Sequence, residues 1–152
     1  MLNDDLYRQE ILEHYRSPQN YGKLRNYTLK AEKINELCGD EITLRLLISP
    51  RLKGPASTRR QGEGVRGGWI KDVKFSGAGC ALSIASASLF TESLKGKSFT
   101  QVTKITQAQV IKKLGIKVGP TRKKCVLLVF ETLQTILKND KRKHSKKTKR
   151  YT

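Results

Sequence analysis

The chain has 152 residues, of which 37% are hydrophobic and 7% aromatic, and its 31 Lys and Arg against 13 Asp and Glu give a formal net charge of +18. This length allows one domain with a hydrophobic core. No apolar run approaches the ~20 residues of a membrane-spanning helix, and Met1 to Asp5 are acidic where a secretory signal would be basic and then apolar. We therefore expect a cytoplasmic protein without membrane association.

Two segments carry much of the positive charge. From Lys138 onward, eight Lys and Arg accompany Asp140 alone, and Arg51 to Arg66 holds five against Glu63. Such segments bind polyanions through counterion release, although a solvated segment is the simpler interpretation. We expect residues 138–152 to form a disordered basic tail. Residues 49–68, with two Pro and five Gly, are expected to form a long mobile basic loop inserted in the domain.

Periodicity predicts the elements of the first half of the chain. Apolar residues recur at helical spacing from 4 to 15, and Ser17-Pro18 ends that pattern. Strands are expected at 27–34, 41–48 and 69–75, because apolar and polar residues alternate there. The first two strands predict a hairpin with Cys38-Gly39-Asp40 at its turn.

Helices dominate the expected second half. A turn at 77–80 leads into a helix over 81–94, which Gly96 stops. Residues 98–114 allow one or two short helices before Gly115 and Gly119. After Pro120 a broad apolar face predicts a helix up to Leu137, although its β-branched residues would also suit a strand. The folded domain is therefore expected to span residues 1–137.

Each of the three cysteines falls at the boundary of an expected element. Cys38 lies in the hairpin turn, Cys80 at a helix start, and Cys125 in the first turns of the last helix. Three cysteines cannot all pair within one chain, and a reducing compartment keeps them as thiols. Their separations of 42 and 45 residues match no zinc finger or ribbon, so incidental core cysteines remain an alternative.

Neighbouring residues favour a reactive site over incidental cysteines. Asp40 follows Cys38 across a glycine, which allows a tight turn that aims both side chains at one ion. A helix N-terminus favours the thiolate of Cys80. The cations of Arg122-Lys123-Lys124 would likewise lower the pKa of Cys125. Thiolate is the form that binds metal and attacks sulfur.

Four motifs in order make the chain recognisable. They are LYRQEILEHY at 6–15 followed by Ser17-Pro18, CGD at 38–40, GAGCALSIASAS at 77–88, and RKKC at 122–125. With these motifs, the chain resembles over 6–137 the U-type iron–sulfur cluster assembly proteins, the family of IscU, SufU and the N-terminal domain of NifU.

The resemblance implies an α+β fold of the SufE/NifU-like type, a three-stranded antiparallel sheet with helices packed on it. It implies a site of Cys38, Asp40, Cys80 and Cys125 that holds zinc or a [2Fe-2S] cluster. Such a protein accepts persulfide sulfur from a SufS/IscS-like cysteine desulfurase and serves apo iron–sulfur proteins, as a scaffold or sulfurtransferase rather than a stand-alone enzyme. The resemblance points to Cys38 as sulfur acceptor, with Cys125 the alternative, and to Arg122 as electrostatic support.

Some residues depart from the family pattern. Lys124 stands where IscU carries a histidine, which favours a SufU-like protein, whereas the short stretch from Cys80 to Cys125 is typical of IscU. Residues 115–120 lack the Leu-Pro-Pro-Val-Lys tract through which IscU engages a chaperone. The subtype therefore stays open.

A second hypothesis uses composition alone, a small nucleic-acid-binding module with a structural zinc site, acting through the basic loop and tail. It lacks a recognition-helix pattern and stacked aromatics on a strand. We do not expect His14 or His144 to be ligands. The small residues from Ala81 to Ser88 are interpreted as a face for close helix packing.

Overall fold

The computed structural model describes the backbone of residues 2–49 and 68–150, and the side chains of residues 5–49 and 68–140. The basic loop expected at 49–68 therefore lies, apart from its two end residues, outside the described residues. The described elements, in order, are α1 (Leu2–Arg16), β1 (Leu29–Asn35), β2 (Asp40–Ser49), β3 (Trp69–Ala78), α2 (Ala81–Leu94), α3 (Phe99–Thr103), α4 (Gln107–Leu114), α5 (Pro120–Val126) and α6 (Leu128–Arg150).

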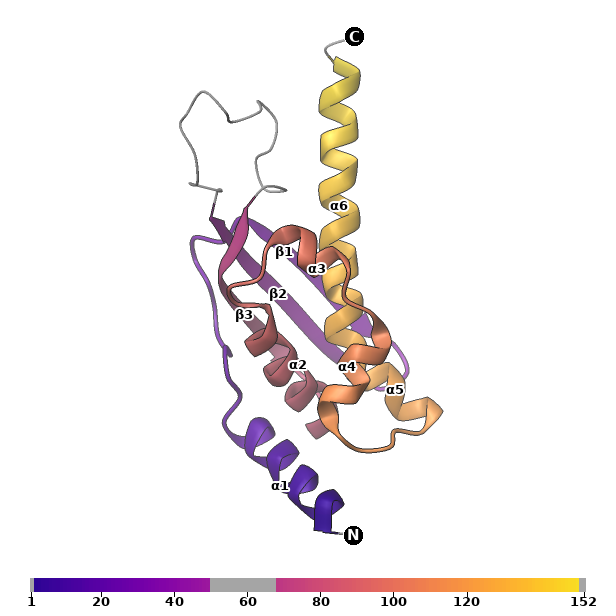
Figure 1. Cartoon of the computed structure of the whole chain (residues 1–152). Coiled ribbons are helices and arrows are strands. Elements are labelled where there is room, and N and C mark those ends of the chain that lie inside the picture. The colour runs from indigo at the N-terminus through magenta and orange to yellow at the C-terminus, as the bar shows by residue number, and fades with distance from the viewer. Residues whose placement is uncertain (1, 50–67, 151–152) are drawn as a thin grey trace.

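The three strands form one antiparallel sheet in the order β1-β2-β3, which confirms the expected α+β fold. Alternate residues of β2 are buried, and these point to the helices, whereas their neighbours are half-buried or exposed. In Figure 1 the helices α2 and α6 lie on the same face of this sheet. The core between the two layers includes Leu44, Phe75, Phe90 and Leu133.

Helix α2 is the centre of the helical layer. Its small side chains allow close approach, as expected for the 81–88 face. Ser88 Oγ lies 2.7 Å from His14 Nδ1 on α1, and Ser86 Oγ donates to the carbonyl of Val126 at 2.7 Å. These contacts fasten α1 and α5 to α2, so that three helices and the sheet converge at one end of the molecule.

The last helices differ from the single helix expected after Pro120. Helix α5 ends at Val126, where Leu127 caps it, and α6 begins at Leu128. Residues 126–130 are all buried, which one straight amphipathic helix with a single apolar face would not achieve. The break lets both segments bury their apolar residues, and it leaves Cys125 in the short α5.

Helix α6 is longer than the helix up to Leu137 that the sequence predicted. Helix α6 continues to Arg150, and Asp140 is only 5% exposed. The sequence from 138 to 150 contains neither Gly nor Pro, and Lys and Arg are good helix formers that suit a helix C-terminus. In Figure 1 the end of α6 extends beyond the sheet.

Candidate functional site

The β1–β2 turn holds the first two site residues. Gly39 has φ of +73°, a left-handed conformation that favours glycine, and its N–H donates to the carbonyl of Asn35 at 2.8 Å. The turn closes the hairpin with Asn35 opposite Asp40. As a result Cys38 is exposed at the tip, whereas Asp40 is buried at the start of β2.

The end of β3 brings the second cysteine to Asp40. A Cβ atom at Gly77, whose φ is +137°, would overlap the carbonyl oxygen of Glu41, so only glycine allows this close approach to β2. At Gly79 a Cβ would lie 3.2 Å from Asp40 Cγ. The chain thereby places Cys80 at the N-cap of α2, where its N–H donates to Asp40 Oδ1 at 3.2 Å. The two glycines therefore allow the end of β3 to approach Glu41 and Asp40 closely.

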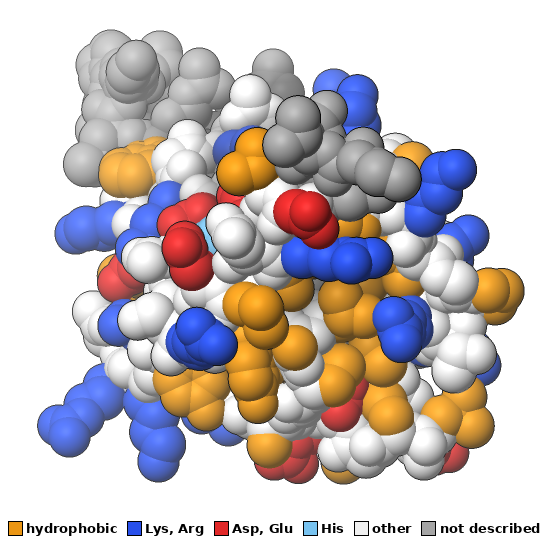
Figure 2. Space-filling model, turned by 90° about the horizontal axis from the view of Figure 1, so that it is seen from below, with side chains coloured by type: hydrophobic (Ala, Val, Ile, Leu, Met, Phe, Trp, Pro, Cys, Tyr) orange, Lys and Arg blue, Asp and Glu red, His pale blue; other side chains and the backbone are white. Residues whose placement is uncertain are grey.

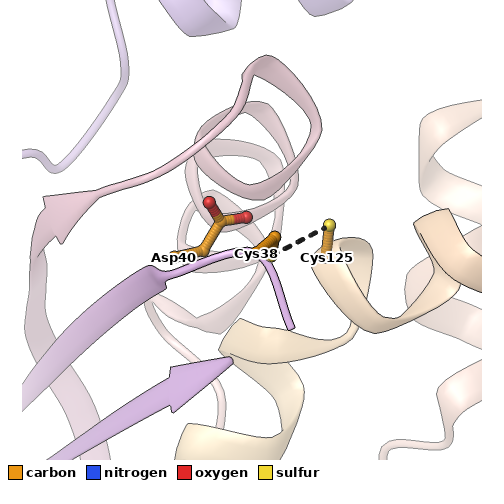
Figure 3. A group of neighbouring side chains, drawn as sticks. All are labelled: Cys38, Asp40 and Cys125. Carbon is orange, nitrogen blue, oxygen red and sulfur yellow. Dashed lines mark hydrogen bonds between the residues drawn. The ribbon is translucent and has the colours of Figure 1, made fainter. Parts of the chain in front are cut away.

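Cys125 completes the cluster from α5. Its Sγ atom lies 3.6 Å from that of Cys38, too far for a disulfide, and all three cysteines are free thiols. One ligand atom each of Cys38, Asp40 and Cys125 lies within 4.8 Å of the others. Figure 3 shows the three side chains together, from the hairpin turn, the start of β2 and α5.

Asp40 is held as a carboxylate despite its burial. Burial raises its pKa, but hydrogen bonds from Ser83, Cys38 and Cys80 outweigh that effect and hold the pKa below its ordinary value of 3.8. The Ser83 hydroxyl donates to Asp40 Oδ2 at 2.5 Å, a short bond to a charged acceptor. The site therefore contains a fixed negative charge at neutral pH.

The thiol of Cys125 resists ionisation in the metal-free site. Burial, a hydrogen bond with Cys38 and the nearby charge of Cys80 raise its pKa to about 12. The expectation that the cations at 122–124 lower this pKa is therefore wrong for the metal-free chain. Several thiolates and a carboxylate so close together repel one another. A cation among them would reverse this effect, because it stabilises every deprotonated ligand.

The predicted residues thus fall into two groups. Cys38, Asp40 and Cys125 meet, and Cys80 lies directly beside them with its Sγ 3.4 Å from Ser83 Oγ. Arg122 is exposed and has no ion pair among the described residues, and nothing in the described structure joins it to the three thiols. Its electrostatic role stays a prediction.

Two further residues have clear placements. The His14 ring forms a hydrogen bond with Ser88, and its Nε2 atom lies 4.0 Å from a carboxylate oxygen of Glu10. Both contacts lie outside the cysteine cluster. The side chain of His144 lies outside the described residues. Sequence reasoning missed Ser83, which it assigned to a packing face. The available signal was its position three residues after Cys80, one helical turn into α2 and on the same side.

Comparisons with known proteins agree with this architecture. A family model described as "NifU-like N terminal domain" matches residues 6–147. The zinc-dependent sulfurtransferase SufU of Bacillus subtilis is 29% identical over 150 residues, covering 86% of this chain and 88% of its own. The iron–sulfur cluster assembly scaffold protein IscU of Thermotoga maritima is 31% identical over 149 residues, covering 88% and 93%.

A solved structure shares the fold. The crystal structure of a "putative iron-sulfur cluster assembly scaffold protein for SUF system" from Fervidobacterium islandicum superposes with a TM-score of 0.64 at 28% identity, and the match covers 85% of this chain and 94% of that one. Within the described residues, none of the helices is both long enough and apolar enough to cross a membrane.

Proposed function

The chain belongs to the family of NifU-like N-terminal domains, and from that premise we propose how its cysteine site serves iron–sulfur cluster assembly. The proposal rests on the close approach of Cys38, Asp40 and Cys125. The two cysteines are 87 residues apart in sequence, yet their sulfur atoms are 3.6 Å apart. The family match and the relatives' names favour this function over the nucleic-acid-binding module.

The donor set fits a zinc ion. Two thiolates bound at about 2.3 Å to a tetrahedral zinc lie roughly 3.8 Å apart, close to the observed Sγ separation of 3.6 Å. Zinc accepts both thiolate and carboxylate ligands in tetrahedral sites. We infer that Cys38, Asp40 and Cys125, with Cys80 as fourth donor, hold the ion. When bound, zinc keeps the thiols deprotonated and protected until sulfur arrives.

We propose that Cys38 receives the sulfur. It is exposed on a turn beside Leu37, which is 72% exposed, whereas Cys125 is partly buried on a helix. The Cys38 thiolate attacks the outer sulfur of a persulfide on a cysteine desulfurase. The new sulfur–sulfur bond forms at Cys38 as the old one breaks, and the desulfurase cysteine leaves as a thiolate. No oxidant or reductant is needed, because one persulfide replaces another.

Two fates of the transferred sulfur use the same four ligands. A carrier passes the persulfide on to another protein. A scaffold needs an external electron donor, such as a reduced iron–sulfur protein, which supplies two electrons for each persulfide sulfur and releases it as sulfide, leaving the Cys38 thiolate. The sulfide then combines with iron into a [2Fe-2S] cluster, which is cargo for apo iron–sulfur proteins. Lys124 next to Cys125 favours the zinc-bound carrier. Elemental analysis with sulfide determination on anaerobically purified protein separates them, since a carrier contains zinc without acid-labile sulfide.

The assignment of Cys38 is tested by single substitutions. Desulfurase and cysteine are mixed with wild type, Cys38→Ala and Cys125→Ala, and the added sulfur is measured by mass spectrometry of the intact chain. We expect sulfur transfer to Cys38→Ala to be at least about tenfold slower than to wild type. The variant lacks the one exposed residue among Cys38, Asp40 and Cys125. Transfer to Cys38→Ala at the wild-type rate would contradict the assignment. Circular dichroism of each variant verifies folding.

The free thiols also suit the reducing cytoplasm that we propose as the compartment. Thiol labelling in intact cells tests this, because an oxidising compartment would block the cysteines.

A further inference from the structure

A groove with a basic lining includes a residue of α5, the helix that carries Cys125. It has a volume of about 650 Å³ and forms where α1 meets α4, α5 and the loop between them. We call it the basic groove, and its lining residues are Arg8, Ile111, Lys112, Gly115, Ile116, Lys117 and Arg122. Arg122 is three residues before Cys125, so one helical turn separates the groove's lining from the site.

The four cations of the basic groove lack negative partners. Arg8, Lys112, Lys117 and Arg122 are exposed, and none of them forms an ion pair within the part of the chain that the structure describes. The sequence supplies no carboxylate nearby on α4 or α5, because residues 93–130 contain nine Lys and Arg and neither Asp nor Glu. On α1, the described acids Asp5, Glu10 and Glu13 are outside the lining. The groove thus presents uncompensated positive charge.

The floor of the basic groove is apolar and fixed. Ile111 and Ile116 are half-buried against the core, and the Tyr7 ring packs directly over Gly115, where a Cβ would overlap it. Leu6 on the same helix is 64% exposed. Figure 2 shows hydrophobic side chains gathered between Lys and Arg side chains on this end of the molecule. An apolar centre with a polar rim is the usual arrangement of a protein interface.

We propose that the basic groove receives an acidic peptide segment of the protein that exchanges sulfur with Cys38. The partner's identity rests on the proposed function, whereas the acidic chemistry rests on the groove. Its volume lies within the range of sites for larger ligands and exceeds what one inorganic phosphate fills. Stacked nucleotides would need free aromatic faces, and the ring of Tyr7 is engaged with Gly115. Carboxylates on a peptide suit both the cations and the apolar floor.

The first experiment uses the full chain and an octaglutamate peptide, followed by NMR of the backbone amides. We expect saturable shifts at Gly115, Ile116 and Lys117, weaker at about 300 mM than at about 50 mM salt because of screening. Octaglutamine should cause none of them. Shifts confined to residues 141–152, or equal binding of octaglutamine, would overturn the proposal. Displacement of the peptide by inorganic phosphate at equal concentration would make it a small-anion site instead.

Matched charge reversals locate the binding. Lys112→Glu with Lys117→Glu should weaken the peptide affinity about tenfold, since two attractions become repulsions. The control pair Lys71→Glu with Lys104→Glu makes the same change in net charge at exposed positions outside the groove. If both pairs weakened the peptide affinity equally, the effect would be one of net charge alone, and the proposal would be overturned. Lys112→Gln with Lys117→Gln repeats the test if the reversal impairs folding.

The desulfurase assay then tests the partner. With wild-type chain as sulfur acceptor, the groove pair should raise KM about tenfold and leave kcat unchanged, because the groove binds without touching sulfur. An unchanged KM would show that the desulfurase does not use the groove. If wild type accepts no sulfur at all, the proposed function fails, yet the NMR result still decides whether the groove binds acidic peptides.

Discussion

Ser83 determines how the buried carboxylate of Asp40 is tolerated. Its hydroxyl supplies the shortest of the bonds to this group, and the Cys80 N–H supplies another. A buried carboxylate that loses a donor pays the full cost of its desolvation. The residue thereby holds a proposed ligand in place without binding the metal itself.

We expect Ser83→Ala to destabilise the metal-free chain by about 1–3 kcal/mol at neutral pH. The folded-state pKa of Asp40 is depressed, so its contribution to stability is present above its unfolded value of 3.8 and is lost as pH falls through the lower folded value. In the variant, loss of the Ser83 hydrogen bond raises this pKa. The deficit should therefore shrink as pH falls below 3.8 toward the lower folded value, as urea unfolding with chelator at pH 7 and near pH 3 would show.

A matched control lies on the same helix. Ser93 donates to the carbonyl of Phe90 at 2.6 Å and contacts no carboxylate in the described structure, so the cost of Ser93→Ala should be independent of pH. A deficit in Ser83→Ala that is equally insensitive to pH would contradict the role assigned to Ser83.

We expect Asp40 to shorten the lifetime of a [2Fe-2S] cluster bound at the proposed site. An oxygen ligand binds iron more weakly than a thiolate does, and we therefore expect Asp40→Ala to lengthen the lifetime of a reconstituted [2Fe-2S] cluster. The decay of the cluster's visible absorption under a chelator measures this. Asp72→Ala, which removes a carboxylate paired with Lys95, should leave the lifetime unchanged. An unchanged lifetime in Asp40→Ala would exclude the carboxylate from the cluster's ligands.

At the scale of elements, the close approach of β3 to β2 decides whether the cysteines converge. We expect Gly77→Ala to cost at least about 2 kcal/mol, because the added Cβ would overlap the Glu41 carbonyl at a strained φ of +137°. Gly96, with φ of +83° and no atom within 4 Å of an added Cβ, provides the control. Gly96→Ala should lose only the strain of its left-handed conformation, about 1 kcal/mol. Thermal unfolding compares the two, and equal losses would contradict the packing argument.

The sequence predicted most elements because their signals are local. Period-two alternation located β2 to within a residue at each end, and Gly77 to Cys80 marked the start of α2. Strand β1 starts at Leu29 rather than at Tyr27, an offset that the sequence pattern did not indicate. The break at Leu127 was equally hidden, because it follows from burial against two layers.

The site could be predicted in composition but not in geometry. The motifs named the cysteines and Asp40, and the hairpin turn that holds two of them was predicted from alternation and a glycine. The bond from Ser83 to Asp40 spans 43 residues, and the basic groove joins three helices. Such contacts leave no local pattern in the sequence. The role of Ser83 and the basic groove could therefore be found only in the folded structure.

At the scale of the whole molecule, truncated chains can show how much of the end of α6 contributes to the stability of the fold. Asn139 and Asp140 border β1 together with Ile136, so the body of the fold reaches at least residue 140. We expect a chain ending at residue 140 to keep its thermal stability, because residues 141–152 contain no apolar residue except Tyr151. A chain ending at Leu137 should unfold at a lower temperature, since it loses buried contacts. Equal stability of both truncated chains would contradict this boundary.

The wide spacing of the proposed ligands has a consequence for how the protein would gain and lose a zinc ion. In a zinc finger, ligands a few residues apart can capture the ion while the chain is still unfolded. Here 87 residues separate Cys38 from Cys125, so an unfolded chain has no preformed binding site. At the proposed site, zinc would then bind the native state and add stability by mass action, about 2.7 kcal/mol at a hundredfold excess over Kd. The melting temperature of this protein should therefore rise with the free zinc concentration around it. Because proteases degrade the unfolded state, the amount of protein that persists among proteases should also depend on the zinc supply.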